Sequence, residues 1–369
     1  MPSQPTSSDV YERLSRRALD GALPSQEEAL WVLDGEEVEL LPLLQAAYAP
    51  RRRKFGKRVM VHVLNNVQNG LCPEDCGYCS QNKDSESAIR KYAMKSDEAI
   101  LAEAEKAAQA GATRYCMVFS GRGPTVDRAR RIGELIREIK QRHPIEVCLS
   151  AGLMGDEHAA ILAEAGLDRL NHNLNTSERR YGAITSTHTY ADRVATLMAA
   201  KRHGIESCSG LIVGMGEESR DIVEVAFKLR ELEVPSIPVN FLIPIAGNQV
   251  QHDGSLTPDR CLRALCLMRF VNPEAEIRVA AGREGHLRSL QALSLYPANS
   301  LFVDGYLTTK GDPVEETYAM IRDAGFEVDG NDTYHEIQAR LAAENAAGRT
   351  QFRIPGGGDQ LLRPEVVRA

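Results

Sequence analysis

The stretch RVMVHVLNNVQNGLCPEDCGYCSQ, from Arg58 to Gln81, decides the fold of this chain. Its first part, 58–65, is rich in β-branched and apolar residues and predicts a buried strand. Turn-forming Gly and Pro residues follow, and the loop that they open gathers three thiols in the spacing C-x3-C-x2-C without a fourth cysteine nearby: Cys72, Cys76 and Cys79. The stretch therefore predicts a strand that leads directly into a chemically specialised loop.

The pattern of this first strand recurs along the chain. From about residue 57, short β-rich runs alternate with helical runs rich in Ala, Glu and Lys. The β-rich runs are RVMVHVLN (58–65), TRYCMVFS (113–120), IEVCLSA (145–151), RLNHNL (169–174), SCSGLIVG (207–214), SIPVNFLI (236–243), EIRVAAG (276–282) and SLFVDG (300–305). Eight β–α units in roughly 260 residues predict an α/β fold of the (β/α)8 TIM-barrel type, with a doubly wound open sheet as the alternative.

The segments that flank the barrel have different compositions. Residues 1–56 are expected to form an N-terminal helical extension, in which Ser25 and Glu28 fit a capping box. The barrel is expected to span 57–330. A C-terminal helix and a Gly- and Arg-rich mobile tail are expected over 331–369.

Composition and charge exclude several classes of protein. The chain has 369 residues, 43% of them apolar, and a net charge of −7, which disfavours general nucleic-acid binding. No apolar run approaches the ~20 residues of a membrane helix, and the N-terminus lacks a secretory signal. We therefore expect a cytoplasmic protein whose eight cysteines stay reduced and serve metal binding or catalysis. The basic run 51–54 is expected to be solvated surface.

Side-chain alternation predicts a polar barrel interior. The apolar positions of the strands should face the surrounding helices, which turns the other positions inward. The inward polar set is Cys116, Ser120, Cys148, Ser150, Asn171, Asn173, Asn175, Asn240 and Arg278, with His172 on the opposite face. Unpartnered polar groups are costly to bury, so this interior is expected to hold a ligand. The alternative is that these strands are misphased and the polar residues sit at the rim.

Three interpretations of the cysteine loop compete. A structural zinc site needs four ligands, and His62 lies within the strand before the loop, where it is poorly placed. Free thiols could also gather by coincidence. The third interpretation is an iron–sulfur cluster, in which three thiolates leave one iron of a [4Fe–4S] centre open to another molecule. Such a loop at the carboxyl end of a barrel strand is placed where barrel enzymes carry out their chemistry.

The loop resembles the signature of the radical S-adenosylmethionine (SAM) superfamily, with Tyr78 as the aromatic residue before the last cysteine. The resemblance implies that the open iron chelates SAM, whose reductive cleavage gives a 5′-deoxyadenosyl radical. Further blocks between about residues 10 and 330 resemble the biotin synthase family. These blocks are GLCPEDCGYCSQ, GATRYCMVFSGRGP, RLNHNLNTS, TSTHTYADRV, CSGLIVGMGE, IPVNFL, EIRVAAGRE and ANSLFVDGYLTT.

The family resemblance implies a second, [2Fe–2S] cluster deep in the barrel. Its implied ligands are Cys116, Cys148, Cys208 and Arg278. Alternation does not test Cys208, which shares a face with a glycine and an isoleucine. Residue chemistry alone suggests that Arg278 is a counter-charge, because guanidinium stays protonated in ordinary settings. Two more cysteines lie in a helical run and are expected to be small buried hydrophobic residues: Cys261 and Cys266.

The implied reaction converts dethiobiotin to biotin, with sulfur from the [2Fe–2S] cluster. Two C–H bonds break, so two SAM cleavages are implied, and no catalytic side chain is expected beyond the cluster ligands. The resemblance places Tyr78, Asn175 and Arg193 beside SAM, although many members of the family carry Asp at the position of Asn175. It further places Asn173 and Asn240 at the ureido ring of dethiobiotin, and Thr308 and Thr309 at its carboxylate tail.

The resemblance also implies partners: an electron-donor protein, the iron–sulfur assembly machinery and a second copy of the chain in a homodimer. Two alternatives remain open at this point. The first is another radical SAM enzyme, of the hydrogenase-maturation or methylornithine-synthase type. The second is a cluster-binding sensor or scaffold without catalysis, which the polar interior and the SAM motif disfavour.

Overall fold

A computed structural model describes residues 7–250, 254, 256–303, 305–307 and 311–329, together with residue 339. Two of the predicted substrate residues, Thr308 and Thr309, lie outside the described residues. The expected C-terminal helix and tail, 331–369, also lie outside them except for that single residue.

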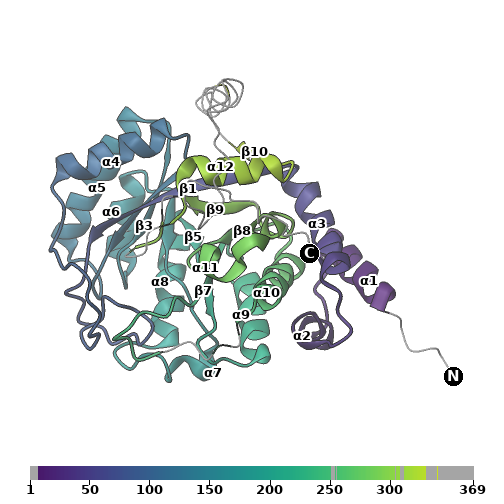
Figure 1. The fold of residues 1–369 in the computed structure, drawn as a ribbon. Coiled ribbons are helices and arrows are strands. Elements are labelled where there is room, and N and C mark those ends of the chain that lie inside the picture. Colours follow the sequence, from purple (N-terminus) through teal and green to yellow (C-terminus); the bar gives the residue numbers. More distant parts are fainter. Residues whose placement is uncertain are drawn as a thin grey trace, which may run out of the picture. The chain divides into compact units, whose positions relative to one another are not determined.

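Parallel strands form the centre of the fold, and the sheet closes on itself (Figure 1). The order around the barrel is β1, β2, β3, β4, β5, β7, β8 and β9, and the short strand β6, which follows β5 in the sequence, also pairs with β7. The ring closes because β9 pairs with β1, from Met60↔Ser300 to Val63↔Val303. The predicted closed barrel is therefore confirmed. The strands are β1 (Arg58–Gln68), β2 (Arg114–Phe119), β3 (Glu146–Ser150), β4 (Arg169–Asn171), β5 (Glu206–Cys208), β6 (Leu211–Val213), β7 (Ser236–Phe241), β8 (Glu276–Val279), β9 (Ser300–Val303) and β10 (Glu327–Asp329).

Two features of the sheet differ from the prediction. The run 207–214 forms two short strands, because the backbone at Gly210 presses against the neighbouring strand β7. A β-carbon at Gly210 would lie 1.8 Å from the Pro238 carbonyl oxygen. The chain also adds β10, which the sequence did not predict and which extends the sheet by pairing with the start of β1, from Arg58↔Glu327 onward.

Helices surround the barrel, and several begin at a Ser or Thr whose side chain accepts a hydrogen bond from the first turn, as helix N-caps do. Outward-facing strand residues pack against these helices in two large apolar clusters. The helices are α4 (Asp97–Gln109), α5 (Val126–Arg142), α6 (Asp156–Glu164), α7 (Glu178–Tyr181), α8 (Tyr190–Arg202), α9 (Ser219–Glu231), α10 (Pro258–Val271), α11 (Arg283–Leu287) and α12 (Val314–Asp323), with a 3-10 helix η1 (Arg288–Leu295).

Three helices precede the barrel: α1 (Ser7–Leu19), α2 (Gln26–Asp34) and α3 (Leu40–Phe55). The predicted capping box is present, since the Glu28 amide donates to Ser25 Oγ at 3.1 Å and the Ser25 amide donates to Glu28 Oε2 at 2.8 Å. The three helices pack against α10, and α2 also contacts α9 (Figure 1). They share one apolar cluster with these barrel helices.

The prediction that 51–54 is solvated surface is wrong for its first residue. Arg51 is fully buried, while the next three residues are exposed. Its guanidinium donates to the carbonyls of Ala298 at 3.2 Å and Arg58 at 2.8 Å, and also to the carbonyl of Gly56. The reason is helical period: Arg51 lies one turn beyond Ala47 on the face of α3 that is turned toward the barrel.

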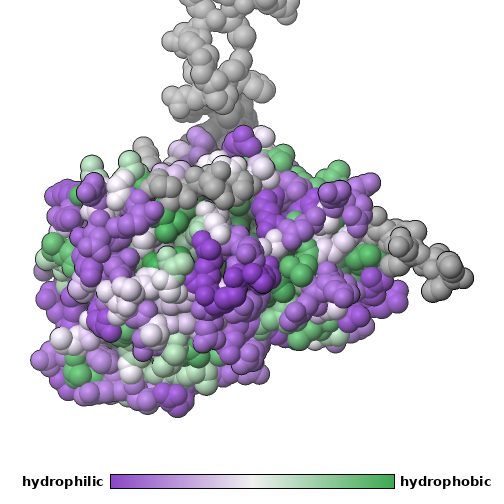
Figure 2. Space-filling view, turned by 90° about the horizontal axis from the view of Figure 1, so that it is seen from below, coloured by the Kyte–Doolittle hydropathy of each residue, from purple (hydrophilic) through white to green (hydrophobic). Residues whose placement is uncertain are grey.

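One face of the described residues is mainly hydrophilic, as the charged composition predicts. Figure 2 shows a face on which hydrophilic residues predominate and hydrophobic residues are scattered in small patches. Within the described part of the chain, no helix is both long and apolar enough to cross a membrane.

Candidate functional site

The strands of the barrel present two distinct faces, as alternation predicted. Apolar residues of β2 and β3 join the cluster formed with the outer helices: Tyr115, Met117, Phe119, Val147 and Leu149. Cys116 and Cys148 instead pack inside the barrel with Ala280 and Phe302. The alternative in which these strands are misphased is therefore wrong.

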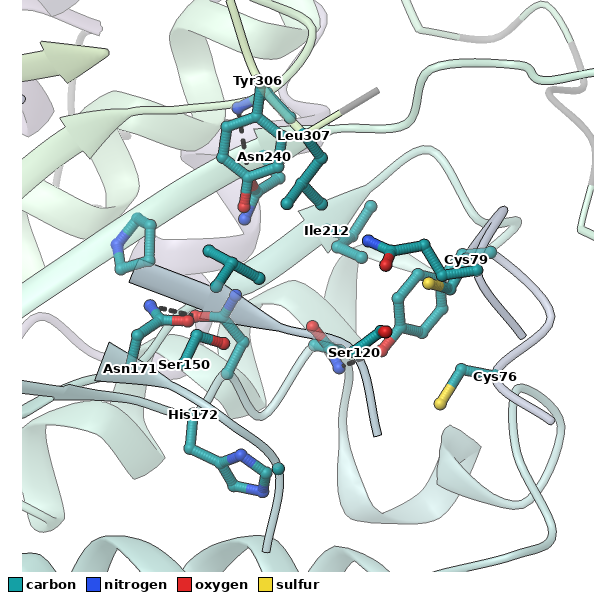
Figure 3. A pocket seen from close by; sticks show the side chains of 18 of the residues that line it. Cys76, Cys79, Ser120, Ser150, Asn171, His172, Ile212, Asn240, Tyr306 and Leu307 are labelled. Atoms are coloured by element: carbon teal, nitrogen blue, oxygen red, sulfur yellow. Dashed lines mark hydrogen bonds between the residues drawn. The ribbon is translucent and has the colours of Figure 1, made fainter. Parts of the chain in front are cut away.

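One cavity of about 280 Å³ lies at the carboxyl ends of the strands and reaches into the barrel. The three loop cysteines and two of the deep cysteines border it. The loop after β1 contributes Cys72, Cys76 and Cys79, while the strands contribute Cys116, Cys148 and Arg278. Figure 3 shows Cys76 and Cys79 at one end of the cavity and Ser150 and Asn171 at the other.

One predicted orientation is wrong. His172, expected on the outer face, also lines the cavity. The strand β4 ends at Asn171, so residues 172–175 belong to a loop in which strict alternation no longer applies. Leu174, two residues further on, lies in the apolar cluster.

The cysteine loop folds into a tight turn around its thiols. The Cys79 amide donates to the Cys76 carbonyl at 2.9 Å, and Asn82 Nδ2 donates to the same carbonyl at 2.7 Å. Burial raises the pKa of the Cys79 thiol to about 12 and also raises the pKa of Cys72. Thiols with raised pKa values are weak nucleophiles on their own, and a bound metal would supply the positive charge that stabilises their thiolates.

Two acidic residues of this loop fasten it to the segment before α8. Glu74 Oε2 accepts from Thr187 Oγ1 at 2.6 Å and lies 2.5 Å from His188 Nδ1. Asp75 accepts from the Thr185 hydroxyl at 2.6 Å and from the Ser186 amide at 3.0 Å. The sequence did not predict this attachment, because neither the cysteine loop nor the segment before α8 has a local pattern that indicates a contact with the other.

A hydrogen-bond chain runs from the loop to Arg193. Arg193 Nη2 lies 2.9 Å from His188 Nε2, and Arg193 Nη1 donates to the Asn173 carbonyl at 2.9 Å. Because arginine can only donate, Nε2 of His188 accepts and the ring proton sits on Nδ1, facing Glu74. Burial first, and then the Arg193 charge, lower the pKa of His188, which agrees with a neutral ring.

The residues predicted to border SAM line this same cavity. They are Tyr78, Asn175 and Arg193. Asn175 Nδ2 donates to Tyr78 Oη at 2.6 Å. Asn175 has a φ of 70°, a left-handed conformation that Asn tolerates better than most residues. The conformation and the contact are both compatible with an amide side chain at this position.

The residues predicted to bind the ureido ring also line the cavity, with their amides partly engaged by backbone groups. Asn173 Oδ1 accepts from the Gly210 amide at 3.1 Å. Asn240 Nδ2 donates to the Leu211 carbonyl at 3.0 Å, and its Oδ1 accepts from the Ala281 amide at 3.2 Å. These bonds fix the direction of each amide. Tyr306 also borders the cavity (Figure 3) and was not predicted.

The deep cysteines come from neighbouring strands and meet inside the barrel. Cys116 and Cys148 are register partners on β2 and β3. A hydrogen bond from the Cys148 thiol lowers the pKa of Cys116, and a further bond joins Cys148 to Cys208. Asn171 Nδ2 contacts Cys208 Sγ at 3.2 Å, and Arg278 Nη1 contacts it at 3.6 Å. The face of Cys208, which alternation left open, is therefore inward.

Below the three deep cysteines lies a buried layer of charged residues. Glu276 lies 2.9 Å from His62 Nε2, and its carboxylate accepts from Arg114 at 3.1 Å and from Arg278 at 2.5 Å. His62 thus faces the interior of the barrel floor, which removes the one residue that had been considered as a fourth zinc ligand for the loop. Glu276 was not predicted, although alternation from Arg278 would have placed it on the same face.

The thiols outside α10 form two groups of three, and iron–sulfur clusters are held by cysteine thiolates. Among the described residues, all eight cysteines are free, and no three His, Cys, Asp or Glu side chains converge tightly enough to hold a single metal ion. Thiolates in sets of three suit iron–sulfur centres, which are larger than one ion. Cys261 and Cys266 are buried in the apolar cluster around α10, away from both sets, as expected.

Comparisons with known proteins agree with this architecture. The Radical SAM superfamily model matches residues 68–229, and the model of the Biotin and Thiamin Synthesis associated domain matches residues 238–327. Among solved structures, a methylornithine synthase (PylB) superposes with a TM-score of 0.75 at 18% identity, covering 88% of this chain and 99% of that one. A FeFe-hydrogenase maturase HydG from Carboxydothermus hydrogenoformans gives 0.73 at 18% identity, covering 88% and 80%. These identities establish the shared fold alone.

Fold and site together define a radical SAM barrel enzyme. The relatives are more specific. Biotin synthase from Acaryochloris marina is 58% identical over 83% of this chain and 88% of the relative, and that from Magnetococcus marinus is 54% identical over 86% and 98%. The chain belongs to the biotin synthase family. Membership of the radical SAM superfamily implies a [4Fe–4S] cluster and SAM.

Proposed function

We propose that this chain converts dethiobiotin to biotin, the last step of biotin biosynthesis, by inserting sulfur between two saturated carbons. The observation that carries the proposal is a cavity bordered by the three loop cysteines and by two of the three deep cysteines, Cys116 and Cys148. One set suits the generation of a radical, and the other suits a store of sulfur. A sensor or scaffold would have no need to bring both sets to one enclosed space.

The loop cysteines are proposed to hold the [4Fe–4S] cluster: Cys72, Cys76 and Cys79. This cluster, when bound, supplies the electron that cleaves SAM to methionine and a 5′-deoxyadenosyl radical. Arg193, fixed by His188 and by the Asn173 carbonyl, offers a cation for the carboxylate of SAM. Tyr78 and Asn175 are proposed to border the nucleoside.

The deep residues are proposed to hold the [2Fe–2S] cluster, which is consumed as the sulfur source: Cys116, Cys148, Cys208 and Arg278. Asn173 and Asn240, whose amides are oriented by backbone bonds, are proposed to recognise the ureido ring. Thr308 and Thr309 are proposed to bind the carboxylate tail. Apolar side chains of the cavity wall exclude water from a reactive carbon centre, and they include Leu64, Val118, Ile212 and Phe302.

Anaerobic reconstitution tests this function. The protein is loaded with iron and sulfide and supplied with a reductant, SAM and dethiobiotin. We expect 5′-deoxyadenosine and biotin, with two molecules of the nucleoside formed for each biotin. Formation of 5′-deoxyadenosine without biotin would show that the radical acts on another substrate.

The assignment of two clusters is tested by Cys148→Ala. This variant is expected to lose the [2Fe–2S] absorption and to retain the [4Fe–4S] absorption, because only the deep set is broken. Cys266→Ala is the matched control, since Cys266 is equally buried but lies in the cluster around α10. An unchanged spectrum in Cys148→Ala would contradict the deep site.

We further propose the setting in which the enzyme works. It is cytoplasmic, where its thiols stay reduced, and receives electrons from a small donor protein. The iron–sulfur assembly machinery rebuilds the consumed cluster.

We also propose that two copies of the chain form a homodimer, and that each chain has three functional segments: 1–56, 57–330 and 331–369. Analytical ultracentrifugation of the loaded protein tests the dimer, which a monomeric mass would contradict.

A further inference from the structure

The carboxylate of Glu276 occupies an unusual position on the barrel floor. Its side chain is almost completely buried, and three nitrogen-bearing side chains converge on it: His62, Arg114 and Arg278. TIM-type barrels are ordinarily filled by branched aliphatic residues. A buried carboxylate is costly unless it is paired and hydrogen-bonded, so its position directly under the deep cysteines calls for a specific role.

The contacts of Arg278 divide its three nitrogens into two groups. Nε and Nη2 both donate to Glu276 Oε1, at 3.2 and 2.5 Å, and Nη2 also donates to Ser236 Oγ at 2.8 Å. The guanidinium carbon lies 5.1 Å from the centre of the Phe302 ring. Nη1 is turned the other way, toward Cys208 Sγ at 3.6 Å. The side chain is thus fixed on one edge and presents one nitrogen to the thiols.

Burial of an arginine in this fold does not by itself require a carboxylate. Arg269 is also fully buried, and its guanidinium donates to the carbonyls of Pro273, Ala275 and Pro297 and to the Asn299 amide oxygen. Carbonyl acceptors therefore suffice elsewhere in the barrel. Glu276 adds something that these acceptors lack, a charged oxygen to which two nitrogens of the same guanidinium donate at once, and this fixes the direction of the guanidinium.

We propose that Glu276 is a positioning residue for the deep cluster site: with Ser236 it holds Nε and Nη2 of Arg278, so that Nη1 is the nitrogen presented to the cluster. This inference rests on the proposed [2Fe–2S] site and deepens it, because it names the atom of Arg278 that faces the cluster and the residue that selects it. Arg114, which bridges Glu276 and Glu146, anchors the carboxylate from the opposite side.

The test compares Glu276→Gln and Glu276→Ala with Glu274→Gln as the matched control. Glu274 lies two residues earlier and is half exposed, and it pairs with Lys54 instead of Arg278. Each protein is produced with ¹⁵N-labelled arginine, reconstituted anaerobically and reduced by one electron at the [2Fe–2S] centre. Pulsed EPR then measures the coupling of an arginine nitrogen to the cluster, and absorption measures the content of each cluster.

The wild type and Glu274→Gln are expected to show the same arginine coupling. Glu276→Gln retains one acceptor and should show an altered coupling, while Glu276→Ala should lose it. The [4Fe–4S] content should be equal in all four proteins. Wild-type coupling in Glu276→Ala would overturn the proposal, and so would a fall in [4Fe–4S] content that matches the loss of coupling, since that would indicate a general failure of the fold.

A failure of the underlying function has a different signature. If the wild type itself assembles only the [4Fe–4S] cluster, the deep site does not exist, and both proposals are overturned. If the wild type assembles both clusters but shows no arginine coupling, the function stands and the role of Glu276 is overturned.

Discussion

At the scale of single residues, the barrel depends on a backbone contact that leaves no room for a side chain. Gly210 separates β5 from β6 and approaches the Pro238 carbonyl more closely than any β-carbon could. This approach allows Cys208 to end β5 while Ile212, on β6, lines the cavity. The position of one deep thiol therefore depends on the absence of a methyl group at residue 210.

Gly210→Ala is expected to destabilise the cluster-free protein by more than about 2 kcal/mol, because overpacking next to backbone atoms cannot be relieved by a side-chain rotation. Urea unfolding measures the change. Gly182→Ala is the matched control, since a β-carbon added there would meet no described atom within 4 Å and the φ of Gly182 is −64°. The control should stay within about 0.5 kcal/mol of the wild type. Equal stability of the two variants would contradict the close contact.

At the scale of elements, Arg51 ties α3 to the base of the barrel. It links the end of this helix to the start of β1 and to the segment before β9. The helical extension is thus attached by hydrogen bonds as well as by apolar packing. Arg51, which the sequence pattern assigned to the surface, therefore helps to hold the helical extension against the barrel.

Arg51→Ala is expected to cost about 2–3 kcal/mol of stability, because it leaves the buried Ala298 carbonyl without its donor and removes the packing of a fully buried side chain. Arg53→Ala, from the same basic run but exposed, should change stability by less than about 0.5 kcal/mol. Thermal and urea unfolding of the cluster-free proteins give both values. An unchanged free energy of unfolding in Arg51→Ala would contradict a structural role for this residue.

The cysteine loop is a second segment held in place by identifiable side chains, of which Asp75 makes the most bonds to 185–187. Asp75→Ala removes the bonds to 185–187, so the loop should hold its cluster less firmly, and iron should be lost to a chelator several-fold faster than from the wild type. Asp84→Ala, an exposed acidic residue a few positions later, is the control and should match the wild type. Equal rates for all three proteins would show that these bonds do not stabilise the loop.

The sequence predicted those parts of the site that follow from local periodicity. The inward position of Cys116 and Cys148 follows from a period of two within regular strands. The positions of Glu276 and His188 relative to the thiols depend on which strands and loops become neighbours, which no single segment encodes. Arg51 was misjudged because a run of four basic residues was treated as one unit, although helical geometry turns its first member inward.

At the scale of the whole molecule, the interior is polar where most barrels are apolar. Thiols, amides and a buried ion-pair network replace an aliphatic core, so the cluster-free protein lacks part of the cohesion that other barrels derive from their centre. Cluster binding should therefore add to stability, because ligands that bind only the folded chain stabilise it by mass action.

Removal of the clusters with a chelator and reductant is expected to lower the melting temperature of the wild type by several degrees, as calorimetry under nitrogen would measure. A double variant, Cys72→Ala with Cys148→Ala, is the control and should melt at the same temperature before and after the treatment. Identical melting of the loaded and stripped wild type would show that the clusters make no contribution to the stability of the fold.

The closure of the barrel between β1 and β9 has a consequence for the order of events during synthesis. The deep thiols lie on β2, β3 and β5, whereas the pairing that seals the ring needs Ser300 to Val303. A nascent chain thus carries all of its deep thiols long before their enclosure can form. The ring therefore cannot be sealed before Ser300 to Val303 have been synthesised, which is after every deep thiol and also after Arg278.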